Sequence, residues 1–123
     1  MSDNKQVALK FHKEIFQDHV FDNLDDYLHD KFVSHSIFDP ITDKPFFINC
    51  FKGFFNENPE FKSEVKRVIV DGDYVVLHNH NAFSSQHNGF VAVDIFRFRD
   101  GKIEEHWDIV QEIPETSKVS NVF

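Results

Sequence analysis

The chain has 123 residues, of which 41% are hydrophobic and 16 are phenylalanine, and its net charge is −8. This length suits one domain, residues 1–123, and is too short for two. The acidic balance, without a cluster of Lys and Arg, argues against nucleic acid and anionic membrane surfaces as partners. The single Cys50 excludes an internal disulfide and fits a reducing compartment. Because the sequence shows no signal-peptide pattern and no apolar run of about 18 residues, we expect a cytoplasmic protein.

Hydrophobic residues at helical spacing predict three helices in the first half of the chain. Asp3 followed by Gln6 resembles a capping box, which places a helix start there. Pro45 suits the first turn of another helix, whose buried side includes Phe47 and Phe51. The predicted helices run from the Asp3 cap to about residue 20, from about 23 to 28, and from 45 to about 56. An extended segment over 32–36 separates the last two.

The second half of the chain is typical of strands, because apolar and polar residues alternate there. Asp71-Gly72 and Asp100-Gly101 predict tight turns between paired strands. The predicted strands span residues 61–70, 74–83, 90–99 and 102–111. Helices followed by an antiparallel meander indicate an α+β domain with the helices packed on one face of a curved sheet.

Polar side chains interrupt the apolar pattern of the last hairpin. His106 and Asp108 share one face of their strand, and Trp107 lies on the other. The direction of Asp94 depends on the register of the hairpin. A strict two-residue loop sets Asp94 opposite Trp107 and away from Asp108, whereas one bulged residue brings the two aspartates to the same face. The residues alone leave both registers open.

Three further histidines need an explanation. His78 and His80 point to the same face of one strand, and such a pair can bind a metal if a third ligand converges on it. The sequence does not fix that ligand, so a pocket-lining pair and an ordinary pair of surface histidines stay open. His35 follows an apolar pair and is typical of a capping or surface histidine. Phe38, Phe46, Phe47 and Phe90 could together form an apolar wall, although each alone is more typical of plain core.

The chain resembles the SnoaL-like polyketide cyclase family in three segments, DIFRFRDGKIEEHWDIVQ, FVSHSIFDP and FFINCFKGFF. This family belongs to the nuclear-transport-factor-2-like superfamily, which also contains ketosteroid isomerase and scytalone dehydratase. The resemblance covers nearly the whole chain. It implies a cone: a strongly bent mixed sheet wrapped around the long N-terminal helix, with a deep pocket at the open end. It implies no metal and no other cofactor.

The resemblance also implies roles for individual residues. Polyketide cyclases of this kind use an aspartate as general acid/base in an intramolecular aldol condensation, and that aspartate corresponds to Asp108. Asp94 corresponds to a polar pocket residue on the neighbouring strand, which favours the bulged register. The chain departs from the family pattern at two positions, because the cyclases often have His or Gln in place of Asp94 and because Ala92 is apolar. These departures leave the substrate open.

We therefore predict a single cavity that binds a small apolar or carbonyl-containing ligand. The predicted catalytic residues are Asp108, His106 and Asp94, and the predicted substrate-binding residues are His35, His78, His80, Trp107, Phe47 and Phe51. The first hypothesis is an enzyme that transfers a proton next to a carbonyl, in aldol chemistry, isomerisation or dehydration. The alternatives are a non-catalytic binding module and a structural homodimer with a vestigial pocket. Apolar residues on both faces of the strands, together with the resemblance, predict a homodimer in any case.

Overall fold

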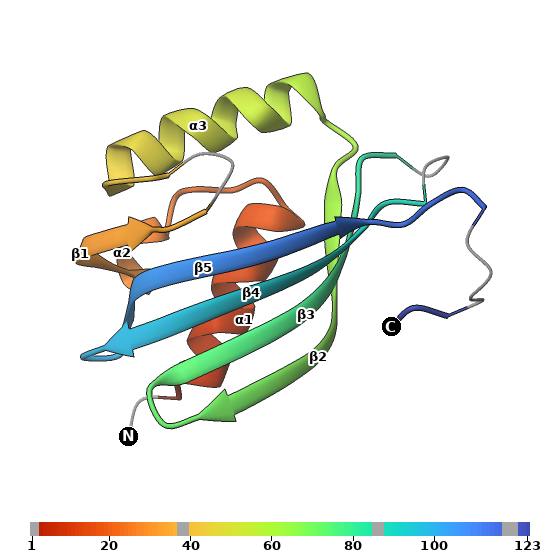
Figure 1. Cartoon of the computed structure of the whole chain (residues 1–123). Coiled ribbons are helices and arrows are strands. Elements are labelled where there is room, and N and C mark those ends of the chain that lie inside the picture. Colours follow the sequence, from red (N-terminus) through yellow and green to blue (C-terminus); the bar gives the residue numbers. More distant parts are fainter. Residues whose placement is uncertain (1–2, 37–39, 85–87, 117–120) are drawn as a thin grey trace.

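The computed structural model describes residues 3–36, 40–84, 88–116 and 121–123, so Phe38 of the predicted apolar wall lies outside the described residues. Three helices cover one face of a five-stranded curved sheet (Figure 1). The elements in chain order are α1 (Asn4–Phe16), α2 (Leu24–Tyr27), β1 (Leu28–Ser34), α3 (Lys44–Glu57), β2 (Lys62–Asp71), β3 (Tyr74–Ala82), β4 (Phe90–Arg99) and β5 (Lys102–Glu112). The predicted α+β fold is confirmed.

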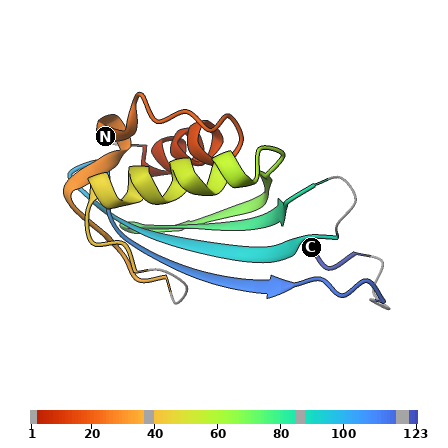
Figure 2. The same ribbon diagram turned by 90° about the horizontal axis from the view of Figure 1, so that it is seen from above.

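The sheet has the strand order β1-β5-β4-β3-β2. Strands β2 to β5 form the predicted antiparallel meander, and β1 adds to β5 in parallel, which makes the sheet mixed. Seen from above, the sheet bends under the helices, and α1 and α3 lie on its concave side (Figure 2). In the described part of the chain, no helix combines the length and the apolar character that a membrane crossing requires.

The helix starts follow from their capping residues. The Asp3 side chain accepts a hydrogen bond from the Gln6 amide at 3.2 Å, and Asp43 caps α3 in the same way. Helix α1 is shorter than the predicted segment, which reached about residue 20. It ends at Phe16 because His19 adopts a left-handed backbone conformation with φ 58°, which a helix cannot continue through. Its buried side, which includes Ala8, packs toward the sheet.

The hairpin of β4 and β5 has the bulged register. Asp100 and Gly101 form the two-residue turn, with φ of 53° and 80°. The register then shifts by one residue, because Glu104 is inserted between two pairs of the ladder. As a result Asp94 lies opposite Asp108. The bulge is not at the turn glycine, where glycine-based bulges commonly occur, but three residues further along.

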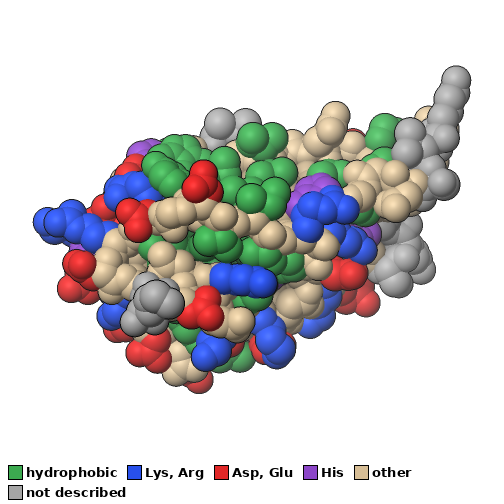
Figure 3. All heavy atoms as spheres, turned by 90° about the horizontal axis from the view of Figure 1, so that it is seen from below, with side chains coloured by type: hydrophobic (Ala, Val, Ile, Leu, Met, Phe, Trp, Pro, Cys, Tyr) green, Lys and Arg blue, Asp and Glu red, His purple; other side chains and the backbone are tan. Residues whose placement is uncertain are grey.

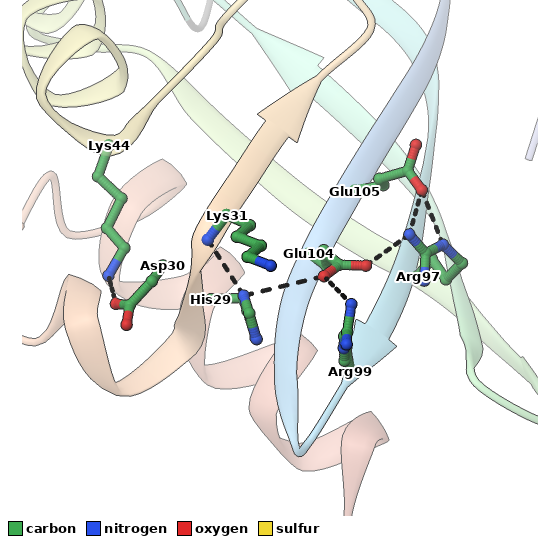
Figure 4. A network of polar contacts seen from close by, with 8 residues as sticks. All are labelled: His29, Asp30, Lys31, Lys44, Arg97, Arg99, Glu104 and Glu105. Carbon is green, nitrogen blue, oxygen red and sulfur yellow. Dashed lines mark hydrogen bonds and ion pairs between the residues drawn. The ribbon is translucent and has the colours of Figure 1, made fainter.

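Ion pairs hold the bulged residue. Glu104 is buried, and its carboxylate forms ion pairs with Arg97 at 2.6 Å and Arg99 at 3.3 Å. His29 of β1 lies 3.9 Å from the same carboxylate (Figure 4). The Arg97 guanidinium, more than any other neighbour, lowers the pKa of Glu104 below its ordinary value. Arg97 also donates to Glu105 at 2.8 Å. Charged side chains on β1, β4 and β5 therefore fix the backbone at the point where the register shifts.

Candidate functional site

A cavity of about 460 Å³ lies between the concave face of the sheet and helices α1 and α3. Its size is in the range of small-molecule sites. Ten of the lining side chains are phenylalanines, among them the predicted Phe47, Phe51 and Phe90. Phe46 is not among them, because it lies on the outer side of α3 and is 44% exposed. The predicted apolar wall is thus correct for Phe47 and Phe90 and wrong for Phe46.

The three predicted catalytic residues lie together in this cavity. Asp94 comes from β4, and His106 and Asp108 come from β5. One ligand atom from each lies within 4.8 Å of the others. They share the concave face because the bulge at Glu104 shifts β5 by one residue and turns His106 and Asp108 inward.

Hydrogen bonds fix two members of this group. His106 Nε2 lies 2.7 Å from Asp94 Oδ1, and Asn79 donates to the other carboxylate oxygen, also at 2.7 Å. An ionised carboxylate only accepts, so Nε2 carries the proton. His106 Nδ1 then accepts from the Ser34 hydroxyl at 2.7 Å, which β1 brings into place by pairing Ser34 with His106. Ser34, His106, Asp94 and Asn79 form a continuous chain of hydrogen bonds that engages both ring nitrogens and holds the imidazole in one orientation.

Asp108 is held differently. Its Oδ1 is buried and has no hydrogen-bond partner in the described part of the chain. Burial raises the pKa of Asp108, and the negative charge of Asp94 raises it further, whereas His106 and a hydrogen bond from Ser36 act in the opposite direction. The result is a carboxyl group that retains its proton more strongly than an exposed aspartate and has one buried oxygen to which no described residue donates.

A second polar group in the cavity was missed by sequence reasoning. His12 of α1 lies with Nε2 2.8 Å from Ser63 Oγ, and Ser63 donates to Asn81 Oδ1. Burial lowers the pKa of His12, while the charge of Asp94 opposes that shift. A signal was present in the sequence, because His12 falls on the apolar stripe of its helix and Asn81 shares a strand face with Leu77.

His78 and His80 lie on the convex face of the sheet and do not line the cavity. Strand alternation gives the concave face to Asn79 and Asn81 instead. His78 accepts from Arg67, and His80 Nε2 lies 2.8 Å from the Asn88 carbonyl. The prediction that at least one of these histidines lines the cavity is therefore wrong.

Trp107 and His35 are also on the convex side. Their rings stack with centroids 5.3 Å apart, and His35 Nε2 lies 2.8 Å from Glu105 Oε2. The register that turns Asp108 inward turns Trp107 outward, and because Ser34 of β1 lines the cavity, alternation turns the next residue, His35, to the convex side. The prediction that Trp107 and His35 contribute to the cavity is wrong for this reason.

The three predicted catalytic residues also meet the distance requirement for a metal ion. Asp94, His106 and Asp108 are the one such group in the part of the chain that the structure describes. Both ring nitrogens of His106 are engaged, however, so a metal could bind Nε2 only by displacing Asp94. A metal-free site stays a prediction.

Solved structures with the same fold share little sequence with this chain. AclR from Streptomyces galilaeus, a candidate hydroxylase, has a TM-score of 0.73 and 19% identity, covering 96% of this chain and 91% of its own. A candidate polyketide cyclase from Acidithiobacillus ferrooxidans has a TM-score of 0.74 and 16% identity, covering 87% of each chain. A nuclear-transport-factor-2-like protein of unknown function from Cytophaga hutchinsonii has a TM-score of 0.73 and 14% identity, covering 90% and 92%. At such identities the similarity shows the fold alone.

No functionally curated protein matches the sequence. The family model of the SnoaL-like polyketide cyclases matches residues 6–116, which is almost the whole chain. The fold, with its mixed curved sheet and its polar group inside an apolar cavity, agrees with that match. The chain belongs to the SnoaL-like polyketide cyclase family.

Proposed function

We propose that the protein is an enzyme that transfers a proton next to a carbonyl group of an apolar ligand in the cavity, with Asp108 as the general acid/base. The observation that carries this proposal is the position of the Asp108 carboxyl group, which lines a cavity with ten phenylalanine side chains and lies directly opposite Asp94. A raised pKa makes the ionised carboxylate a stronger base than a solvated aspartate.

In the proposed reaction the Asp108 carboxylate removes a proton from the carbon next to the carbonyl. The C–H bond breaks, an O–H bond forms on Asp108, and the electron pair becomes the enolate. The enolate carbon can then form a C–C bond with a second carbonyl, whose alkoxide takes the proton back from Asp108. If the proton instead returns to another carbon, the outcome is an isomerisation. Both routes regenerate the carboxylate.

Asp94 and His106 support this chemistry without moving. The Asp94 charge disfavours ionisation of Asp108 and so increases its basicity. His106, held by Ser34 and Asp94, presents a fixed imidazole beside the reacting carboxyl group. We assign both as positioning residues for Asp108.

A suitable probe is para-phenylacetophenone, which has an apolar biphenyl body and an acetyl methyl group next to its carbonyl. In heavy water the enzyme should exchange the methyl protons for deuterium faster than buffer does, as followed by proton NMR. Asp108→Asn should reduce the exchange by ~10²–10⁴-fold, the usual contribution of general acid/base catalysis. Binding of the ketone, measured by calorimetry, should change little, because the variant keeps the shape of the side chain.

The matched control is Ile95→Val, a small change on the convex face of β4, which should exchange at the wild-type rate. Exchange that survives Asp108→Asn would refute the acid/base assignment. Tight binding of the ketone without any exchange in the wild type would favour the non-catalytic binding module.

A further inference from the structure

The polar lining of the cavity is divided between two places. The acid group, defined as Asp94, His106 and Asp108, lies on β4 and β5. The amide group, defined as His12, Ser63 and Asn81, lies on α1, β2 and β3. The rest of the lining is largely apolar and includes ten phenylalanine side chains. The reaction proposed above uses only the acid group, so the amide group needs its own explanation.

The direction of the hydrogen bonds within the amide group shows which donor it can present to a ligand. Ser63 donates its hydroxyl proton to Asn81 Oδ1, so its oxygen accepts from the Nε2–H of His12. His12 is buried, and burial lowers its pKa, which favours the neutral imidazole that this arrangement requires. The chain of bonds fixes the Asn81 amide with Oδ1 occupied. In the described residues nothing accepts from Asn81 Nδ2, which leaves a donor at the cavity wall.

A purely structural role explains the amide group less well. Other bonds already join the end of α1 to β2: Gln17 donates to the Ser63 carbonyl, His19 bonds the Phe61 carbonyl at 2.8 Å, and Lys62 donates to the Gln17 carbonyl. Fixing the helix needs neither an amide on β3 nor a donor directed into an apolar cavity. A polar group in such a lining is favourable when a ligand completes its hydrogen bonds.

The distance between the acid group and the amide group constrains how far apart the polar atoms of a ligand must lie. Asp94 pairs with Leu77, and Asn81 lies four residues further along β3, which corresponds to ~13 Å along the strands. We infer that the ligand carries a second oxygen, a hydrogen-bond acceptor, at the end of its apolar body opposite to the reacting carbonyl, and that Asn81 Nδ2 binds this oxygen. Ser63 and His12 are positioning residues that hold the amide. This inference rests on the proposed function, because it places the reacting carbonyl at Asp108.

Two derivatives of para-phenylacetophenone test the inference. One carries a methoxy group on the far ring, and the other carries an ethyl group of nearly the same size that lacks the oxygen. Calorimetry on the wild type should give a dissociation constant about tenfold lower for the methoxy ketone, the usual worth of one good hydrogen bond. In Asn81→Leu the two ketones should bind equally. Ser63→Ala, which frees the amide to rotate, should retain only part of the preference.

The control variant is Ala82→Ser, at the adjacent residue on the convex face, which should keep the wild-type preference. Thermal unfolding of each variant separates structural damage from lost recognition, because damage weakens both ketones alike. Asp108→Asn should also keep the preference, so a failed acid/base assignment and a failed amide site give different results. A wild type that binds both ketones equally, or neither up to their solubility limit, would overturn the inference. So would an Asn81→Leu variant that still prefers the methoxy ketone.

Discussion

Asp94 and Asp108 lie directly opposite each other on β4 and β5, on the face of the sheet that lines the cavity. Two carboxyl groups in this position repel each other when both are ionised. Asn79 and His106 occupy both oxygens of Asp94, whereas one oxygen of Asp108 has no partner among the described residues. The pair is therefore unequal, with one member held as an acceptor and the other free to exchange a proton.

Replacing Asp94 should lower the pKa of its neighbour. Asp94→Asn removes a negative charge that raises the pKa of Asp108, so Asp108 should titrate at a lower pH than in the wild type. Carbon-13 NMR of the aspartate carboxyl signals measures this shift directly. A titration of Asp108 that does not move, or that moves to higher pH, would show that the two carboxyl groups are not coupled as the geometry requires.

Asp108 should make the free energy of unfolding depend on pH. Well below its ordinary pKa of 3.8, folded and unfolded chains both hold the proton, and the carboxyl has no effect. As the pH rises through the raised pKa of the folded state, the folded chain must ionise a buried group, and stability falls. Asp108→Asn avoids this loss, so its stability relative to the wild type should increase from pH 4 to neutral pH, by on the order of 1 kcal/mol. Urea unfolding over a pH series tests this, and a constant difference would contradict it.

Deletion of Glu104, the bulged residue, should leave each remaining side chain of β5 on the side of the sheet that it occupies in the wild type. A chain without Glu104 can pair Ile103 and Glu105 with the same partners on β4 as before, in a regular ladder. Asp108 should stay in the cavity and the single Trp107 on the convex side, so the tryptophan emission maximum should stay at its wild-type wavelength. Glu104→Gln, which keeps the chain length, is the control. A clear shift to shorter wavelength on deletion would mean that Trp107 has turned inward.

Protein purified without an affinity tag should contain no stoichiometric zinc or iron. His106 uses one ring nitrogen for Ser34 and the other for Asp94, and a metal would have to break the second bond. Elemental analysis measures the content, and addition of a chelator should leave the melting temperature unchanged. One equivalent of tightly bound metal would instead support a centre built on the acid group.

The convex face of the sheet should form a homodimer. Ile69 is 56% exposed and Ile109 is 63% exposed, and hydrophobic side chains gather in a patch that charged side chains border (Figure 3). Light scattering should therefore give twice the chain mass of 14.5 kDa. Ile109→Lys should give the monomer mass, whereas Glu57→Lys at the end of α3 should leave the dimer intact. A wild type that is monomeric at micromolar concentration would refute this.

Much of the fold could be predicted from local signals. The Asp100-Gly101 turn, the Asp3 cap and the alternation of the strands each depend on neighbouring residues, and the structure confirms them. The pairing of β1 with β5 is different, because it joins segments about seventy residues apart, as in Ser34 with His106. Only the family resemblance implied a mixed sheet.

The cavity residues were predicted where the resemblance favoured one register of the hairpin, and they were missed where one of the two faces of β3 had to be chosen. Alternation divides β3 into two sets of residues without stating which set is buried. The prediction assigned His78 and His80 to the cavity. The other set of residues contains Val75 and Leu77, both fully buried, and ends in Phe83. Val75, Leu77 and Phe83 are together bulkier than the apolar residues of the histidine set, Tyr74, Val76 and Ala82, and this difference indicates the concave face, which also carries the two asparagines.

The single extra residue in β5 has an evolutionary consequence. In a hairpin with the same sequence but no bulge, Glu105 and Trp107 would face the ligand, and Asp108 would face solvent or a partner. Whether Glu104 is accommodated as a bulge thus selects between an acidic interior and an indole-lined one. A mutation elsewhere in the hairpin that removed the bulge but kept the residue would exchange the chemistry of the cavity in one step, without substitution of any residue that lines it. Deletion of Glu104 itself would not, because it removes the extra residue together with the bulge.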